Sequence, residues 1–161
     1  MPAPHYDLII RGGVAVLPWG EEASDIGVRQ GRIAAIGVPA SAEADVEIDA
    51  RGLAVLPGLI DTHVHLREPG ADHVETIATG TKAAALGGLV AVFDMPNTRP
   101  AITDAERLAW KRDYIHGRAF VDMGLYVGAT KTNTGNLAEL ELEPGVCGIK
   151  VFAGSSTGDL L

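Results

Sequence analysis

The chain has 161 residues, and 13 Lys and Arg against 21 Asp and Glu give it a formal charge of −8. This acidic balance disfavours a surface for nucleic acid or for an anionic membrane. Hydrophobic residues make up 47% of the chain, which excludes a disordered chain, and no apolar run approaches the ~18 residues of a membrane-spanning helix. Because Cys147 is the single cysteine and the first residues lack a secretion signal, we expect a cytoplasmic protein.

The first third of the chain consists of short β-rich runs separated by glycines, a pattern typical of antiparallel hairpins. These runs cover residues 6–11, 14–17, 25–29, 32–36 and 46–49. Gln30 and Gly31 lie between two of them and predict a tight turn, because glycine reaches positive φ without steric cost. The pattern therefore predicts a small β-sheet layer.

From about residue 53 the pattern changes to longer units in which apolar runs alternate with helical stretches. Strands are expected over residues 53–60, 89–94, 120–128 and 146–153. A helix is expected over 73–86, with Asp72 and Glu75 as a capping box. A second helix should run from a similar signature at 103–106 to about His116, followed by a less regular stretch around 136–140.

The predicted fold class is α/β, because strands that are apolar on both faces and alternate with helices indicate a parallel sheet covered by helices. A doubly wound sheet or a (β/α)8 barrel would satisfy this pattern. Residues 55–161 are predicted to be the first part of a TIM-type barrel, since a whole barrel typically needs ~250 residues. The chain ends at Leu161, where Gly158 and Asp159 predict the opening of another helix, so we expect an incomplete barrel.

His63 and His65 are the strongest candidates for metal ligands. They are two residues apart at the C-terminal end of a predicted strand, so the strand period points both imidazoles to one side. Two polar residues at the point where a strand meets solvent would be the ordinary alternative. The apolar run before them and the use of this rim for active sites in barrels favour a metal such as Zn²⁺.

Lys150 lies on a predicted strand in which no face looks solvated apart from the lysine itself. Desolvation lowers the pKa of a lysine, and the neutral amine can take up CO₂ to form a carbamate. Such a carbamate can bridge two metals ~3.5–4 Å apart. The alternative is a surface lysine whose stem packs on apolar neighbours.

Further polar residues follow the same strand ends. Arg67 offers a planar fork suited to a carboxylate, and Asn97 offers a donor and an acceptor, although each could equally stabilise a loop. Asp61 and Asp94 occupy matching ends of two strands and are candidates for orienting the histidines or the loops. No role is assigned to the other histidines, which are His5, His73 and His116.

Several motifs resemble those of dihydroorotases, within the cyclic amidohydrolases of the amidohydrolase superfamily. The strongest is the run LPGLIDTHVHLREPG at residues 56–70, which is similar to the signature around the metal-binding histidines. DMPNT at 94–98 and GIKVF at 148–152, with GSSTG at 154–158, are also similar. The resemblance implies that residues 1–54 form the N-terminal β-sandwich segment that flanks the barrel of this family.

The activity implied by this resemblance is zinc-dependent, reversible hydrolysis of the ring amide of dihydroorotate to N-carbamoyl-aspartate in pyrimidine biosynthesis. His63 and His65 would bind one of two Zn²⁺ ions, and a carboxylated Lys150 would bridge the pair. Arg67 and Asn97 would bind the substrate carboxylate. The resemblance also implies two more histidine ligands and an aspartate that shuttles the proton, all expected beyond Leu161, so no catalytic residue is assigned within the chain.

Allantoinases and dihydropyrimidinases are alternative identities, because they share the histidine pair and the carboxylated lysine. The motifs at 67–70 and 94–98 favour dihydroorotase. An alternative of another class is a non-catalytic dihydroorotase-like scaffold for aspartate carbamoyltransferase, which would have no need for His63, His65 and Lys150. Apart from that possible partner and a small-molecule substrate, we expect a homo-oligomer with no nucleic acid or membrane partner.

Overall fold

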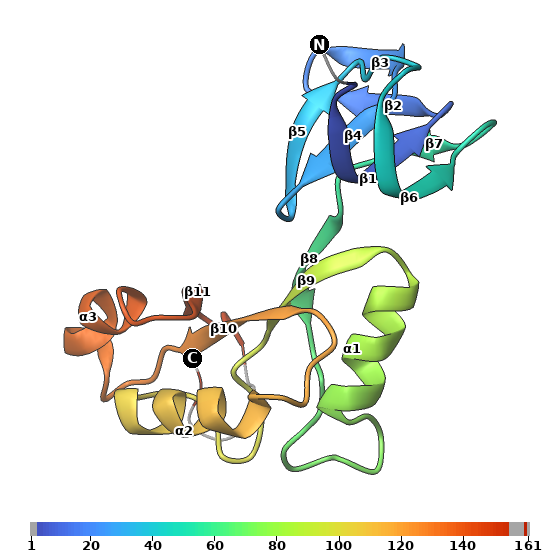
Figure 1. The fold of residues 1–161 in the computed structure, drawn as a ribbon. Coiled ribbons are helices and arrows are strands. Elements are labelled where there is room, and N and C mark those ends of the chain that lie inside the picture. Colours follow the sequence, from blue (N-terminus) through green and yellow to red (C-terminus); the bar gives the residue numbers. More distant parts are fainter. Residues whose placement is uncertain (1–2, 155–159, 161) are drawn as a thin grey trace. The chain divides into compact units, whose positions relative to one another are not determined.

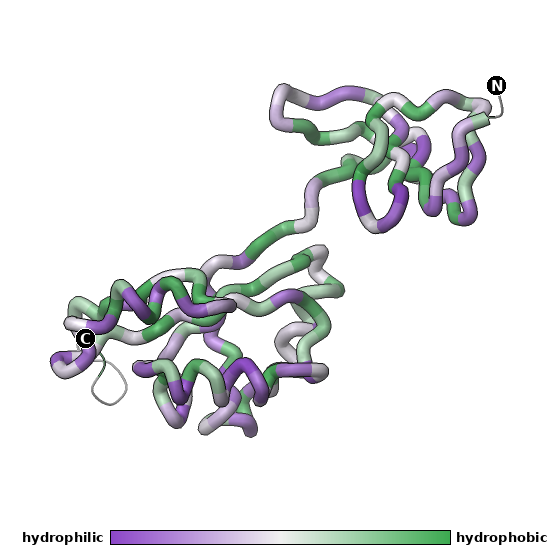
Figure 2. Tube along the Cα trace, turned by 60° about the vertical axis from the view of Figure 1, so that its left-hand side comes forward, coloured by the Kyte–Doolittle hydropathy of each residue, from purple (hydrophilic) through white to green (hydrophobic). Residues whose placement is uncertain are grey.

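The computed structural model describes residues 3–154 and residue 160, and the chain divides into two compact units, Met1–Pro57 and Gly58–Leu161 (Figure 1). The helix expected to open at Gly158 and Asp159, and residues 155–158 of the GSSTG motif, lie outside the described residues. Within each unit, hydrophobic stretches of the trace are separated by hydrophilic ones (Figure 2). In the part of the chain that is described, no helix is both long and apolar enough to cross a lipid bilayer.

The first unit contains two small sheets, one with the strand order β5-β4-β1-β6 and one with the order β3-β2-β7. Their strands are β1 (His5–Arg11), β2 (Val14–Leu17), β3 (Gly20–Ala23), β4 (Ile26–Arg29), β5 (Arg32–Ile36), β6 (Glu43–Asp49) and β7 (Ala54–Val55). The pair β4–β5 is antiparallel as expected, and β3, which was not predicted, pairs antiparallel with β2. By contrast, β1–β6 and β2–β7 are parallel, and such pairs need long crossover connections that local turn signals do not reveal.

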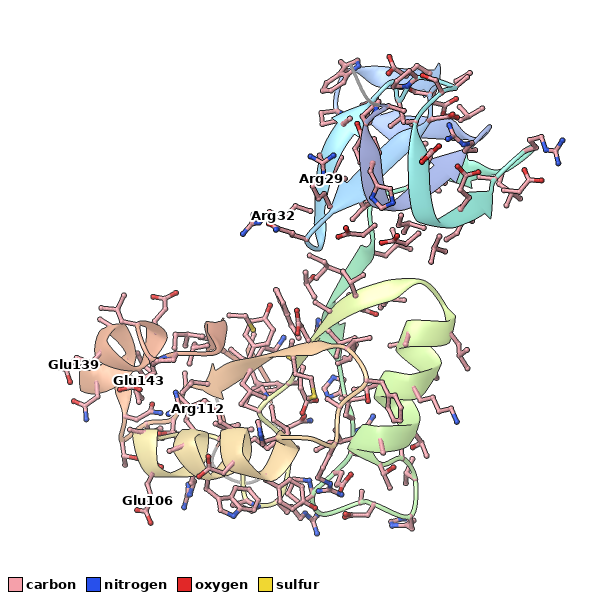
Figure 3. The ribbon with its side chains drawn as sticks, viewed as in Figure 1. Arg29, Arg32, Glu106, Arg112, Glu139 and Glu143 are labelled. Atoms are coloured by element: carbon pink, nitrogen blue, oxygen red, sulfur yellow. The ribbon has the colours of Figure 1, made fainter. Side chains whose placement is uncertain are left out.

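The turn between β4 and β5 confirms one local prediction. Gln30 has a φ of 51° and Gly31 a φ of 69°, so both central residues are left-handed, as a two-residue hairpin turn of type I′ requires. Arg29 and Arg32, which flank the turn, are paired across the two strands (Figure 3).

The second unit is an α/β structure built on the parallel sheet β11-β10-β9-β8, which curls as the opening strands of a (β/α)8 barrel do (Figure 1). Its strands are β8 (Leu59–Val64), β9 (Leu89–Asp94), β10 (Asp122–Gly128) and β11 (Val146–Lys150). Its helices are α1 (Ile77–Leu86), α2 (Ala105–Ile115), the 3-10 turn η1 (Thr134–Asn136) and α3 (Leu137–Glu141). Parallel strands that follow chain order and alternate with helices confirm the α/β class.

The apolar run at 53–60, expected as one strand, is divided between β7 and β8. Pro57 and Gly58 lie between the two strands, and this dipeptide type favours a break in regular structure. The two strands also belong to different sheets.

The helices α2 and α3 pack on the sheet through one apolar cluster. It consists of Ile102, Leu108, Leu125, Val127 and Leu140, all buried. At its edge, Arg112 of α2 donates to the carbonyl of Pro144 at 2.7 Å and lies 3.8 Å from Glu143 (Figure 3). This cluster fixes α2, and thereby the residues of α2 that approach the candidate site.

The sheet is not buried along its whole length, contrary to expectation. Leu59, Ile60 and Val90 are each about half exposed. The described part of the chain supplies no element that covers them, whereas the apolar runs predicted buried strands.

The start of α1 also differs from the prediction. The helix begins at Ile77 rather than near residue 73, and its capping box joins Thr76 and Thr79. Asp72 instead accepts a hydrogen bond from the backbone N–H of Gly70 at 2.8 Å, which stabilises the preceding loop. The second helix starts as predicted, since Asp104 caps α2 by accepting from the N–H of Arg107.

Candidate metal and substrate site

The two candidate ligands lie together at the carboxyl end of β8. His63 is the second-to-last residue of β8, and His65 is the first residue after its end. Their ring centres are 5.4 Å apart, with the planes tilted by 50°. Zn–N bonds are ~2.0–2.1 Å long, so one ion can reach a nitrogen of each ring. The pair therefore fits an open site for a divalent metal.

The strand end that carries these histidines is held by a carboxylate. Asp61 Oδ1 accepts a hydrogen bond from the backbone N–H of His63 at 2.9 Å. This contact agrees with the expectation that Asp61 orients the histidine segment.

His65 is oriented by a second side chain, Asn97. The Nδ1 atom of His65 lies 2.9 Å from Oδ1 of Asn97. Because an amide oxygen can only accept a hydrogen bond, Nδ1 must carry the proton. The other ring nitrogen, Nε2, is then available to a metal. Metal-binding histidines commonly donate their other ring N–H in this way. Asn97, predicted to bind substrate, is thus first of all a partner of His65, although it also lines the neighbouring pocket.

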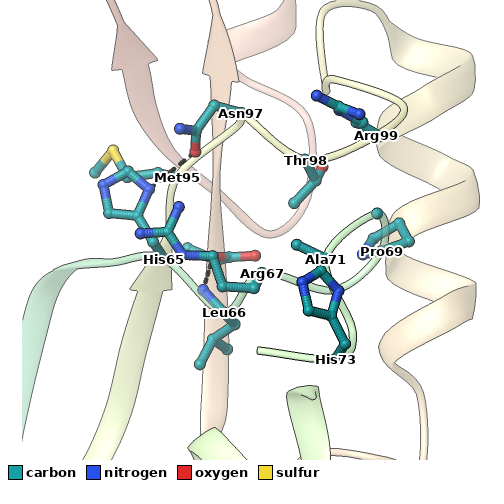
Figure 4. Close-up of a pocket in the computed structure, with 12 residues that line it drawn as sticks. His65, Leu66, Arg67, Pro69, Ala71, His73, Met95, Asn97, Thr98 and Arg99 are labelled. Carbon is teal, nitrogen blue, oxygen red and sulfur yellow. Dashed lines mark hydrogen bonds between the residues drawn. The ribbon is translucent and has the colours of Figure 1, made fainter. Parts of the chain in front are cut away.

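The pocket beside His65 has a volume of about 300 Å³ and lies between two loops (Figure 4). His65, Arg67 and His73 come from the loop after β8, and Asn97, Thr98 and Arg99 come from the loop after β9. Most of these side chains are cationic or hydrogen-bond donors. The pocket therefore suits a small polar ligand with carbonyl or carboxylate oxygens.

Sequence reasoning missed two pocket residues, His73 and Arg99. Each stands alone in the sequence without ligand-like spacing, so no local signal identifies it. They reach the pocket because Gly70 lets the two loops approach closely: the backbone N–H of Arg99 donates to the carbonyl of Pro69 at 3.0 Å.

Lys150 is the last residue of β11, so it lies at the same carboxyl edge of the sheet as the histidines. It is half-buried, its register partner is Gly128, and its Nζ atom lies 5.1 Å from the centre of the Phe152 ring. It does not line the pocket that contains His65. Among the described residues, His, Cys, Asp and Glu side chains form no metal-binding group of three or more.

Behind the pocket lies a buried charged cluster that the sequence did not predict. Lys111 has no exposed surface, and Asp94 and Glu68 are each 2% exposed. The Lys111 ammonium donates to the carbonyl of Glu68 at 2.6 Å and lies 3.4 Å from Asp94 Oδ2. Burial raises the pKa of Asp94 and lowers the pKa of Lys111, while the attraction between the two groups opposes both shifts.

The Glu68 carboxylate is the second anion of this cluster. It accepts from the Tyr114 hydroxyl at 2.7 Å, from the backbone N–H of Ile77 at 2.5 Å and from the Arg118 guanidinium. Burial alone would raise the pKa of Glu68, but these donors outweigh it and the pKa lies below its usual value. Lys111 lies between Leu108 and Ile115 on one face of α2, so it is a cation in an otherwise apolar stripe. A lysine in such a stripe is the sequence signal that could have indicated a buried, charged partner.

Comparisons with known proteins give a consistent picture. Residues 52–142 match the dihydro-orotase-like family. The chain is 44% identical over 150 residues to an allantoinase of Desulfitobacterium hafniense strain Y51, covering 92% of this chain and 33% of that protein. It is 44% identical over 154 residues to an allantoinase of Rubrobacter xylanophilus, covering 95% of this chain and 33% of that protein.

A solved structure supports the same grouping. An L-hydantoinase (dihydropyrimidinase) from Arthrobacter aurescens superimposes with a TM-score of 0.86 at 30% identity, covering 96% of this chain and 35% of that one. The chain therefore spans about a third of the length of the relatives that it matches.

Proposed function

We propose that this chain, which belongs to the dihydro-orotase-like family, contributes to a metal-dependent hydrolase that opens the ring amide of allantoin. One observation carries the chemistry: two imidazoles 5.4 Å apart, one of them oriented by Asn97, stand beside a pocket lined by hydrogen-bond donors. The names of two relatives at 44% identity support allantoin as the substrate. These names support allantoin better than dihydroorotate, the substrate that the sequence motifs led us to expect.

The histidines are the proposed metal ligands. His63 and His65 would hold a divalent cation, with zinc proposed because imidazole and open coordination suit it. When bound, such metals lower the pKa of a coordinated water towards ~7 and polarise the amide carbonyl. A carboxylated Lys150 as the bridge to a second ion, and the remaining ligands from residues of a complete barrel, also belong to this proposal.

The residues around the pocket would bind and orient the substrate. Allantoin is a hydantoin ring with a ureido substituent, so its edges present carbonyl oxygens and N–H groups. Arg67 can donate to these oxygens and then to the carboxylate that ring opening produces. Asn97 would keep His65 in place through its amide oxygen, while its NH₂ group remains available to the substrate.

Hydrolysis of a hydantoin or a dihydropyrimidine is the second candidate. It is favoured by the superposition on the L-hydantoinase (dihydropyrimidinase), with a TM-score of 0.86. Those substrates share the cyclic ureide with allantoin but lack the ureido arm. The two candidates therefore differ in what the donors of the pocket must bind outside the ring.

The test is a comparison of substrates with the complete, zinc-loaded protein. We expect the highest kcat/KM with allantoin, a lower value with hydantoin and dihydrouracil, and the lowest with dihydroorotate. Turnover of dihydrouracil without turnover of allantoin would replace the first candidate by the second. A zinc-loaded protein that turns over none of the four would reject the hydrolase, and failure to bind zinc would favour the scaffold.

A further inference from the structure

We propose that Lys111 is a positioning residue that sets the backbone conformation of Arg67 and thereby aims its guanidinium into the pocket. Nothing in the established family membership assigns a role to this lysine. This role rests on the proposed function, because its kinetic test measures allantoin hydrolysis. Its structural readout is independent of that function.

The backbone at Arg67 is unusual. Its φ is 34°, in the left-handed region that residues other than glycine rarely adopt. Across it, the backbone N–H of Glu68 donates to the carbonyl of Leu66, which closes a tight three-residue turn. A conformation of this kind persists only where the surroundings hold it in place.

Both neighbours of Arg67 are anchored to the buried cluster. On one side, Asp94 Oδ1 accepts from the backbone N–H of Leu66 at 3.0 Å. On the other side, the carbonyl of Glu68 accepts from Lys111 Nζ at 2.6 Å. The two anchors are therefore attached to the residues immediately before and immediately after Arg67.

A single ammonium connects the two anchors. Lys111 Nζ bonds to the carbonyl of Glu68 and also lies 3.4 Å from Asp94 Oδ2, an atom that is buried without a hydrogen bond of good geometry. Because Lys111 has no exposed surface, water cannot readily replace the ammonium. Its loss leaves the carbonyl of Glu68 without its donor and the carboxylate of Asp94 without its counter-charge, so the turn between them is free to relax.

The Glu68 side chain strengthens the same arrangement. Tyr114, one turn beyond Lys111 on α2, donates its hydroxyl to Glu68 Oε1 at 2.7 Å. The residues that hold the Glu68 side of the turn thus come from one face of α2, at positions 111 and 114, and from position 118 just after the helix, whereas Asp94 of β9 holds the Leu66 side. Arg67 is the central residue of the turn and lines the pocket (Figure 4).

The kinetic test is a double-mutant cycle with allantoin and the zinc-loaded protein. Lys111→Met should raise KM about tenfold or more, the effect of weakening a hydrogen bond to a charged group, while kcat and zinc content stay close to wild type. In an Arg67→Ala background, Lys111→Met should add less than about a twofold effect, because the residue that it positions is gone. Lys82→Met, at an exposed lysine on α1, is the matched control and should leave KM unchanged.

A zinc-loaded Lys111→Met protein with unchanged KM, or an equal effect of Lys111→Met with and without Arg67, would overturn the inference. If Lys111→Met does not fold, Tyr114→Phe takes its place in the cycle, and a smaller rise in KM that also vanishes in the Arg67→Ala background is expected. An additive effect would then overturn the inference.

A crystal structure of the folded variant tests the inference without any substrate. We expect Arg67 to leave the left-handed region while His63 and His65 keep their positions. An unchanged Arg67 turn would overturn the positioning role even if allantoin is hydrolysed. If wild-type protein hydrolyses no cyclic ureide, the proposed function fails, and this structural comparison still decides the role of Lys111.

Discussion

The Nδ1 atom of His65 lies 2.9 Å from the Oδ1 atom of Asn97, so an amide from the loop after β9 orients an imidazole from the end of β8. The contact gives Asn97 a role that can be separated from substrate binding. Loss of such a partner typically costs 10–100-fold in metal affinity or activity.

Asn97→Ala should therefore weaken zinc binding by about 10–100-fold, because the His65 ring loses its fixed orientation. Competition with a chromogenic chelator measures this affinity. Asn136→Ala is the matched control, since Asn136 makes no side-chain cap at α3 and is exposed. Unchanged zinc affinity combined with a raised KM would instead assign Asn97 to the substrate alone.

The Glu68 carboxylate should make the free energy of unfolding depend on pH in the acidic range. The pKa of Glu68 is lowered in the folded protein. As the pH falls below the ordinary glutamate value of ~4.5, the unfolded chain therefore binds more protons than the folded chain. The contribution of Glu68 to the free energy of unfolding is lost as the pH falls through its folded pKa. The groups that donate to this carboxylate are the Tyr114 hydroxyl, the backbone N–H of Ile77 and the Arg118 guanidinium, while Lys111 binds the backbone carbonyl of the same residue.

Chemical denaturation of wild type and Glu68→Gln measures this effect at pH 7 and at decreasing pH. We expect the difference in the free energy of unfolding to favour wild type at pH 7 and to shrink towards zero in acid. Subtracting the variant removes the opposite contribution of Asp94, whose pKa is raised. A difference that is constant across this range would show that Glu68 keeps an ordinary pKa.

Gly70 should resist substitution because two loops meet there. Its φ is 109°, and a Cβ at this position would lie 2.6 Å from the Cβ of Arg99. Gly70→Ala should lower the free energy of unfolding by ~1–3 kcal/mol, the usual cost of a disfavoured backbone conformation. Gly135→Ala is the control, since no atom lies within 4 Å of the added methyl. Equal thermal stability of the two variants would show that the loop accommodates a side chain.

Cys147 should be an unreactive thiol in the folded protein. Burial raises its pKa to about 11, so little thiolate exists at pH 8. Iodoacetamide should modify it about a hundredfold more slowly than the unfolded chain, because the thiolate is the reactive form. Equal rates before and after unfolding in guanidinium chloride would contradict the buried environment.

The parts of the fold that depend on local pattern could be predicted from the sequence. The apolar run of β9 and the cap at Asp104 define their elements through nearby residues, and the strand period placed His63 beside His65. The start of α1 was predicted too early, although its capping box of Thr76 and Thr79 is local; the non-local part is the carboxylate of Glu68, nine residues earlier, which also accepts from the N–H of Ile77.

The apolar stripe around Lys111 could indicate a buried partner, but local pattern could not identify that partner. Lys111 meets Glu68 across 43 residues, a contact that exists only after α2 has packed on the sheet. The parallel pairing of β1 with β6 is another such contact, since four strands intervene between them in the chain. Local signals predicted that His63 and His65 lie together at the end of β8, whereas the groups that hold the loop in place depend on tertiary structure.

We propose that opening the ring of a cyclic ureide requires a metal held by His63 and His65. The most direct measurement is the rate of allantoin hydrolysis by the complete protein after chelation and during stepwise return of Zn²⁺, in wild type and in His65→Ala. We expect that chelation abolishes turnover, that zinc restores it in wild type, and that His65→Ala stays inactive at the same zinc concentration. Undiminished hydrolysis by protein that elemental analysis shows to be free of metal would contradict it.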